Sequence, residues 1–249
     1  MGSTPELNIS GAVATITLRR PQAANRLGPD DLAALAAHIA AVDAAEQVLV
    51  LRLEAHGKYF CSGYDIARID AATTAAFEDI ANALEDARPV TLALIQGGVY
   101  GGATDLALAC DFRLGVPAAD MFMPAARLGL HFYQRGLERY VSRLGVDTAK
   151  RLFLTAERIG ADEMKAIGFL THLVAADALH DTAERLSDTL AGMAPLALLG
   201  MKKHLNRIAR GALDAADLQR DIARAAASAD LREGGAAWAE KRPPQFSGR

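Results

Sequence analysis

Residues 90–109 read VTLALIQGGVYGGATDLALA and contain the pattern around which the rest of the chain is organised. The run from Val90 to Ile95 is apolar at all positions but one, as expected for a strand that is covered on both faces of a parallel sheet. Glycines follow at positions 97, 98, 101 and 102, and a helix of small residues is predicted to begin at Gly102. The stretch therefore predicts a strand, a glycine-rich turn and a helix, which is a building unit of α/β proteins.

The preceding residues predict a similar unit. Residues 47–53 form a near-continuous apolar run and are followed by the glycine-rich loop 57–66, which reads GKYFCSGYDI. Upstream, residues 7–18 alternate apolar and polar side chains around Gly11, which predicts a hairpin. Residues 28–31 (GPDD) provide a helix start with proline in the first turn and acids near the positive end of the helix dipole. Strand, helix and strand in this order predict βαβ crossovers.

The chain changes character at about Asp147, where Ala-rich and Leu-rich segments at helical spacing begin to dominate. One short strand is predicted within this part, at residues 169–174. We therefore expect an α/β core over residues 1–190 and a C-terminal helical oligomerisation region over residues 191–249.

Charge and composition exclude several functional classes. The 27 Lys and Arg residues against 30 Asp and Glu residues give a net charge of −3, which offers no reason to expect nucleic acid or an anionic membrane as a partner. Charges interrupt each apolar stretch before the ~20 residues that a membrane-spanning helix needs. Residues 1–6 carry no targeting pattern, so we expect a soluble, cytoplasmic protein. Cys61 and Cys110 are too few for a disulfide framework and are expected to be free thiols.

Both glycine-rich turns follow predicted buried strands, so each could aim backbone N–H groups at an anion or a developing oxyanion. Neither turn has the Lys-Ser/Thr ending of a P-loop, and the turn at 97–105 lacks the spacing of a dinucleotide-binding fingerprint. A single turn of this kind is most simply explained by tight strand-to-helix geometry. Two of them after neighbouring strands weaken that explanation.

Five segments in order along the chain resemble motifs of the enoyl-CoA hydratase/isomerase (crotonase) family. Residues 59–66 (YFCSGYDI) are similar to its F-[CS]-[AS]-G-x-D-[IL] motif, and residues 101–111 (GGATDLALACD) to its GG-containing helix ending in C-D. Residues 21–27, 160–170 and 233–248 are similar to its P-x-x-x-N-x-[LF] stretch, its A-x-E-A-x-x-x-G-[LF]-[VL] segment and its C-terminal ending. The resemblance implies a crotonase-like (ClpP/crotonase) α/β fold with a ββα-superhelix core.

The resemblance also implies a function in fatty acid metabolism, as an acyl-CoA lyase or isomerase. The N–H groups of Tyr64 and Gly102 would form an oxyanion hole around the thioester carbonyl. Removing a proton next to a thioester, hydrating its double bond and losing an adjacent carboxylate all pass through an enolate, which two fixed donors favour. The substrate-binding residues implied are Lys58, Cys61, Ser62, Gly63, Asp65, Ile66, Gly101, Pro124, Ala125, Leu128, Lys241 and Phe246.

The chain departs from the family pattern at the two carboxylates that surround the added water in hydratases. The first position holds Asp105, one methylene shorter, and the second holds Ala125, whose methyl group cannot carry a proton. Asp105 lies one helical turn beyond Gly102 among apolar neighbours that would desolvate it, as a proton-transferring acid needs. The alternative is a carboxylate satisfied by backbone donors.

Further candidates lie in the segment that aligns with the acyl pocket of family members. His131 suits proton transfer near neutrality, and Tyr133 could donate a hydrogen bond to the substrate. Both could instead be hydrogen-bonded packing residues. Cys61 beside Ser62 suggests a nucleophile, but no G-x-S-x-G nucleophile elbow surrounds Ser62. Packing is therefore the better interpretation. The histidines show no metal-ligand spacing, and we predict no metal.

For coenzyme A, which enters as part of the substrate rather than as a cofactor, the resemblance suggests Lys58 together with Lys241 and Phe246 of a neighbouring subunit. A solvated Lys241 is the alternative. Family members form trimers or dimers of trimers, so we expect a homo-oligomer. The leading hypothesis is double-bond hydration or isomerisation with Asp105 as the proton-transferring group. The alternatives are a specialised member such as an acyl-CoA decarboxylase, and a non-catalytic acyl-CoA-binding scaffold.

Overall fold

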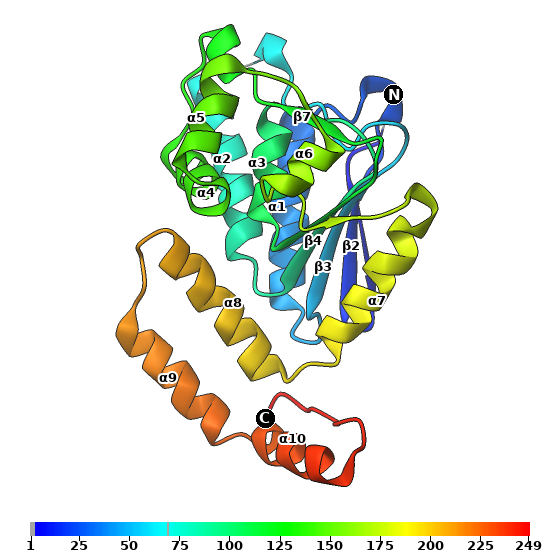
Figure 1. Ribbon diagram of the computed structural model, residues 1–249, viewed down its shortest axis with the longest axis vertical. Helices are drawn as coiled ribbons and strands as arrows, with labels where there is room; N and C mark the ends of the chain where they lie inside the picture. The colour runs from blue at the N-terminus through cyan, green and yellow to red at the C-terminus, as the bar shows by residue number, and fades with distance from the viewer. Residues whose placement is uncertain (1–2, 69) are drawn as a thin grey trace.

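A six-stranded sheet forms the centre of the molecule (Figure 1). The structure is a computed structural model that describes residues 3–68 and 70–249. The strands lie in the order β1-β2-β3-β4-β6-β9; β1 is antiparallel to β2, and each later pair is parallel. Their bounds are Glu6–Ser10 (β1), Val13–Leu18 (β2), Val50–Ala55 (β3), Val90–Ile95 (β4), Phe112–Gly115 (β6) and His172–Leu173 (β9). The predicted hairpin at residues 7–18 and the predicted parallel strands are thereby confirmed.

Helices α1 (Pro29–Ala44) and α2 (Ala71–Asp86) connect β2 to β3 and β3 to β4. Helix α1 begins as predicted, and Asp31 accepts a hydrogen bond from the N–H of Gly28 over 2.8 Å. Its Leu32, Leu35, Ile39 and Val42 are buried. This spacing lays one face of the helix against the core, as its apolar pattern requires.

A smaller sheet lies beside the first and carries part of the site. Its order is β5-β7-β8, formed by Val99–Tyr100, Asp120–Phe122 and Ile159–Gly160. Helices of the same region are α3 (Gly102–Ala109), α4 (Gln134–Leu144), α5 (Val146–Thr155) and α6 (Ala161–Ala166). Short 3-10 turns are formed by Pro21–Ala23, Ile66–Arg68, Ala125–Leu128 and Ala176–Ala178. Strand β4 thus leads through β5 into α3, as residues 90–109 predict.

The C-terminal part is helical. Helix α7 (Leu179–Ala191) packs against β3, β4 and β6, and α8 (Pro195–Ala209) packs against α2, whereas α9 (Ala215–Ala226) and α10 (Ala229–Glu240) extend away from the α/β core (Figure 1). The division at residue 190 into an α/β core and an oligomerisation region stays a prediction. No described helix is long and apolar enough to cross a membrane. Both cysteines are free, as predicted.

Two predicted strands are shorter than expected. Strand β3 begins at Val50 rather than at residue 47, because the Arg88 guanidinium binds the carbonyls of Ala45 (2.6 Å) and Val48 (2.7 Å) and holds this stretch in a turn. The predicted strand at 169–174 is reduced to β9 because Leu170 instead donates from its backbone to the Met164 carbonyl, 2.9 Å away. In both cases tertiary hydrogen bonds override local strand preference.

Candidate active site

Two loops meet where β3 and β4 end. The backbone of Cys61 accepts a hydrogen bond from the N–H of Tyr100 (3.0 Å) and donates one to the carbonyl of Gly98 (3.3 Å). A Cβ at Gly63 would lie 2.8 Å from the carbonyl oxygen of Tyr100 and 3.3 Å from the nitrogen of Gly102. Gly63 also has a φ of +88°, a conformation that favours glycine. Glycine at position 63 therefore allows the two loops to touch.

The Tyr64 N–H is directed away from the neighbouring segment at Leu27. Leu27 donates to the carbonyl of Gly63 over 2.9 Å, and Asp65 donates to the carbonyl of Leu27 over 3.0 Å. Leu27 and Tyr64 form a parallel bridge in which Leu27 bonds to Gly63 and Asp65, on either side of Tyr64. The N–H of Tyr64 therefore points away from Leu27. Among residues 3–68 and 70–249, no protein acceptor receives a hydrogen bond from the Tyr64 N–H.

The second donor is at the start of a helix. Gly102 is the first residue of α3, and the first N–H groups of a helix have no acceptor within the helix. Within the described part of the chain its N–H also has no other protein acceptor. Tyr64 and Gly102 both line one cavity of about 660 Å³. Two residues whose N–H groups have no protein acceptor thus line the same cavity, one of them at the positive end of α3.

The cavity gathers most of the residues that the sequence analysis singled out. Those lining it are Ser62, Gly63, Tyr64, Asp65, Ile66, Gly101, Gly102, Pro124, Ala125, Leu128, His131 and Tyr133. Apolar residues also line the cavity: Leu130 and Phe132 belong to the segment that aligns with the acyl pocket of family members, whereas Phe77, Phe122 and Met123 were not predicted to line it. Phe77 comes from α2, and nothing in its local pattern distinguishes it from an ordinary core residue. These side chains suit the cavity to an apolar acyl group.

Asp105 does not line this cavity. It is fully buried in α3 and forms a bidentate ion pair with Arg139, whose Nε lies 2.8 Å from Oδ1 and whose Nη2 lies 2.6 Å from Oδ2. Oδ2 also accepts a hydrogen bond from the Tyr133 hydroxyl over 2.5 Å. The carboxylate is thus held by side chains rather than by the backbone donors considered in the sequence analysis, and Tyr133 stands between it and the cavity.

Arg139 is the polar residue of this region that the sequence analysis missed. It is 2% exposed, and its Nη1 contacts Asn82 (3.0 Å) and Glu85 (3.1 Å) of α2. A signal was present, because helical spacing places position 139 on the buried face of α4 between Gly136 and Tyr140. A charge on such a face needs a partner, and Asp105 provides it.

Tyr133 and His131 occupy different environments. Burial and the neighbouring Asp105 carboxylate raise the pKa of the Tyr133 phenol well above 10, so the group is neutral and donates to Asp105. The ring of Tyr133 stacks on Phe132 with centroids 4.3 Å apart. His131 is exposed at the cavity, and its Nδ1 lies 2.8 Å from the carbonyl of Phe132. Tyr133 is therefore a fixed polar group of the wall.

A model of the enoyl-CoA hydratase/isomerase family matches residues 8–249. The chain belongs to this family. The short-chain-enoyl-CoA hydratase of Clostridium acetobutylicum is 30% identical to it over 81% of this chain and 80% of that protein. The 1,2-epoxyphenylacetyl-CoA isomerase of Escherichia coli is 29% identical over 97% of both chains. The crystal structure of an enoyl-CoA hydratase from Bacillus anthracis has a TM-score of 0.90 and 25% identity, covering 99% of this chain and 100% of that chain. The predicted crotonase-like fold and the prediction of an acyl-CoA enzyme of the hydratase/isomerase type are confirmed.

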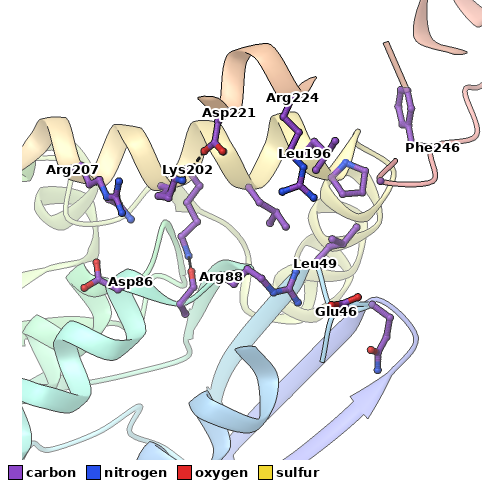
Figure 2. A pocket seen from close by; sticks show the side chains of 18 of the residues that line it. Glu46, Leu49, Asp86, Arg88, Leu196, Lys202, Arg207, Asp221, Arg224 and Phe246 are labelled. Carbon is purple, nitrogen blue, oxygen red and sulfur yellow. Dashed lines mark hydrogen bonds and ion pairs between the residues drawn. The ribbon is translucent and has the colours of Figure 1, made fainter. Parts of the chain in front are cut away.

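Four predicted substrate-binding residues of this hydratase/isomerase family member do not line the cavity. Cys61 is fully buried and its thiol donates to the carbonyl of Asn25, while the Lys58 ammonium lies 5.4 Å from the centre of the Tyr59 ring. Lys241 ends α10. Phe246 lines a different cavity of about 1200 Å³, between α8 and the core (Figure 2). A contact of Lys241 or Phe246 with a neighbouring subunit's substrate stays a prediction.

One cluster in the described part of the chain has the composition of a metal site, comprising His204, Asp217 and Asp221. The Lys203 ammonium lies 2.7 Å from Asp217 and 2.6 Å from Asp221. Arg207 also lies 2.6 Å from Asp217. These cations already neutralise both carboxylates, so the cluster is better explained as an ion-pair network that joins α8 to α9.

Proposed function

We propose that this enzyme binds the carbonyl oxygen of an acyl-CoA thioester between the N–H groups of Tyr64 and Gly102 and stabilises the enolate that forms there. The observation that carries the proposal is that Tyr64 and Gly102, whose N–H groups have no protein acceptor among the described residues, both line one cavity. Donors that are fixed in advance favour the developing charge without reorganisation. Removal of one such donor typically costs on the order of 10²-fold or more in rate.

The acyl group is then directed into the apolar part of the cavity. Phe77, Met123, Leu130 and Phe132 line this part. Coenzyme A extends outward through the mouth, where the half-exposed Arg26 can meet its anionic groups. Lys58 is proposed to contribute there as well, on the family resemblance alone.

A homotrimer or a dimer of trimers is proposed as the assembly, with residues 191–249 as the oligomerisation region. Met201, Leu205 and Ile208 follow one another at helical spacing on α8 and are each more than half exposed. Trp238 of α10 is 88% exposed. Apolar faces of this kind support burial against another subunit, which would also bring Lys241 and Phe246 to a neighbouring site.

For proton transfer we propose the Tyr133–Asp105 pair. The C–H bond next to the thioester carbonyl breaks, its electron pair enters the enolate, and its proton passes to the phenol oxygen of Tyr133 as the phenol proton passes to Oδ2 of Asp105. The reverse transfer returns a proton to the substrate. The 2.5 Å hydrogen bond between Tyr133 and Asp105 supports such a relay. Asp105, the acid or base expected from the sequence, thereby acts through Tyr133.

Among the reactions of the family, this geometry favours isomerisation of a double bond. A single acid/base unit can remove a proton from one end of an allylic system and return it to the other. Hydration uses a second group to hold the water, and Ala125 offers only a methyl group at the cavity. A second candidate is decarboxylation, because Tyr133 presents a neutral phenol at the wall, and loss of carbon dioxide needs donors but no base.

Absorbance, carbon dioxide release and deuterium exchange together separate these reactions. A 3-enoyl-CoA that isomerises gains the absorbance of the conjugated thioester, whereas a 2-enoyl-CoA that is hydrated loses it. Decarboxylation of a malonyl-type CoA ester releases carbon dioxide, and exchange of the α hydrogens of a saturated acyl-CoA with deuterium oxide reports enolate formation in every case. We expect exchange and isomerisation. Binding of CoA esters without exchange, isomerisation, hydration or decarboxylation would contradict the proposal and identify a non-catalytic scaffold.

A further inference from the structure

The peptide bond between Gly101 and Gly102 is held by two donors from one residue. The N–H of this peptide group belongs to Gly102 and is the proposed donor at the cavity, and the carbonyl oxygen of the group belongs to Gly101. That oxygen accepts the backbone N–H of Thr104 at 3.0 Å and the Thr104 hydroxyl at 2.6 Å. Both groups of Thr104 therefore bind the opposite end of the peptide whose N–H would meet the substrate.

The direction of the hydrogen bond between Thr104 and Tyr140 follows from the number of protons available. The oxygens of Thr104 and Tyr140 lie 2.5 Å apart. Because a carbonyl cannot donate, the single hydroxyl proton of Thr104 is used on Gly101, and Tyr140 must donate to Thr104. The order of donation is thus from Tyr140 to Thr104 to Gly101.

Burial makes this chain persistent. Thr104 and Tyr140 are both 0% exposed. Burial raises the pKa of the Tyr140 phenol, so this residue keeps its proton and remains a donor throughout the working pH range. Hydrogen bonds in such chains strengthen one another because each polarises the next.

We propose that Thr104 and Tyr140 are positioning residues that orient the Gly101–Gly102 peptide and strengthen its N–H as a donor to the thioester oxygen. Neither residue touches the substrate; Thr104 and Tyr140 lie outside the set that lines the cavity. The inference rests on the proposed function, because it concerns the same N–H group. It adds to that function a reason why one of the two donors is fixed and polarised before the substrate arrives.

The test uses two variants. One is a double variant that combines Thr104→Val and Tyr140→Phe, and the other is the single variant Thr104→Ser. The double variant removes both hydroxyls at nearly constant volume and leaves no buried hydroxyl without a partner. Thr104→Ser keeps the hydroxyl that binds Gly101. Thermal unfolding of each variant establishes that the fold is retained.

The measurement is the infrared stretching frequency of the thioester carbonyl in ¹³C-labelled butyryl-CoA, free and bound. Binding to the unaltered enzyme is expected to lower this frequency. Binding to Thr104→Ser should lower it by the same amount, and binding to the double variant should lower it less. The kcat for α-hydrogen exchange should fall roughly two- to eightfold in the double variant with little change in KM, since cooperativity changes a donor's strength by a modest fraction.

The outcomes are distinct. If the double variant lowers the frequency as much as the unaltered enzyme does, the inference is wrong while the proposed function stands. If butyryl-CoA does not bind to the unaltered enzyme, or binds without a lower frequency, the proposed function is contradicted and the inference with it.

Discussion

The Tyr133 hydroxyl donates to Oδ2 of Asp105 over 2.5 Å, and Arg139 holds both oxygens of that carboxylate. The acidic residue at the family's first carboxylate position therefore does not line the cavity, whereas the tyrosine that binds it does. This relationship determines what substitutions of Tyr133, Arg139 and Asp105 should do.

Replacement of Tyr133 by Phe should lower kcat for α-hydrogen exchange on the order of 10²-fold or more, because the group between Asp105 and the substrate loses its exchangeable proton. KM should change little, since the ring and its stacking on Phe132 remain. Tyr59→Phe is the matched control, because Tyr59 does not line the cavity. Equal rates for the two variants would remove Tyr133 from the mechanism.

The phenol of Tyr133 should not ionise with ordinary tyrosines near pH 10. Its folded-state pKa is raised by burial and by Asp105, so the stabilisation from its protonated form is fully present below the unfolded value of 10 and is lost only as the pH rises toward the higher folded value. Ultraviolet titration of the unaltered enzyme and of Tyr133→Phe should give the same phenolate absorbance up to about pH 10. A smaller absorbance in the variant at that pH would mean that Tyr133 is already ionised.

Arg139→Met should reduce the free energy of unfolding by about 3–5 kcal/mol, because it leaves the Asp105 carboxylate buried without a counter-charge. The same change combined with Asp105→Leu should regain much of that loss, as apolar replacements of buried ion pairs often do. Denaturant unfolding provides the comparison. Equal stability of the single and double variants would show that Arg139 does not chiefly neutralise Asp105.

Adding a methyl group to Gly63 should separate the two loops. Its backbone has a φ of +88°, and a Cβ would lie 2.8 Å from the carbonyl of Tyr100. The left-handed conformation alone costs an L-residue about 1–2 kcal/mol, and a shift of the loop would displace the Tyr64 N–H. We expect Gly63→Ala to lose most of its exchange activity.

The matched control for this change is Gly235→Ala in α10, where a Cβ meets no atom within 4 Å and φ is not positive. It should keep full activity and gain up to about 1 kcal/mol of stability from helix propensity. Full activity in Gly63→Ala would contradict the role given to the Gly63 turn.

Ala125→Glu should introduce hydration of 2-enoyl-CoA. The side chain lines the cavity, so a carboxylate there can hold a water for addition to the double bond. Hydration should rise by on the order of 10²-fold over the unaltered enzyme, measured as loss of conjugated-thioester absorbance. Ala125→Gln has the same size without the base and should show no gain; a gain in both variants would exclude general-base catalysis as its cause.

The order of strands and helices in the core could be predicted because it follows from local pattern. The apolar run at 90–95 and the glycines that follow it encode a buried strand and a tight turn, and periodicity alone distinguishes the α/β core from the C-terminal helices. The loop and turn that line the cavity could be located for the same reason, since the backbone conformation at Gly63 is one that only glycine adopts readily.

The ends of β3 and the state of Asp105 could not be predicted, because residues far away in the sequence determine them. Arg88 holds the turn before β3, and Arg139, 34 residues beyond Asp105, binds its carboxylate. The hydrophobic periodicity of the sequence does not indicate such pairs.

The sequence by itself determined where the backbone could bend and which faces of its helices and strands would be buried, because these properties depend on single residues and their spacing. It thereby determined the fold and the two glycine-rich loops of the site. Only the tertiary structure decided how the polar groups pair. Ion pairs and hydrogen bonds depend on distances of a few ångströms between segments that are brought together by folding. That is why the Tyr133–Asp105–Arg139 arrangement and the Thr104–Tyr140 support of Gly101 emerged only in three dimensions.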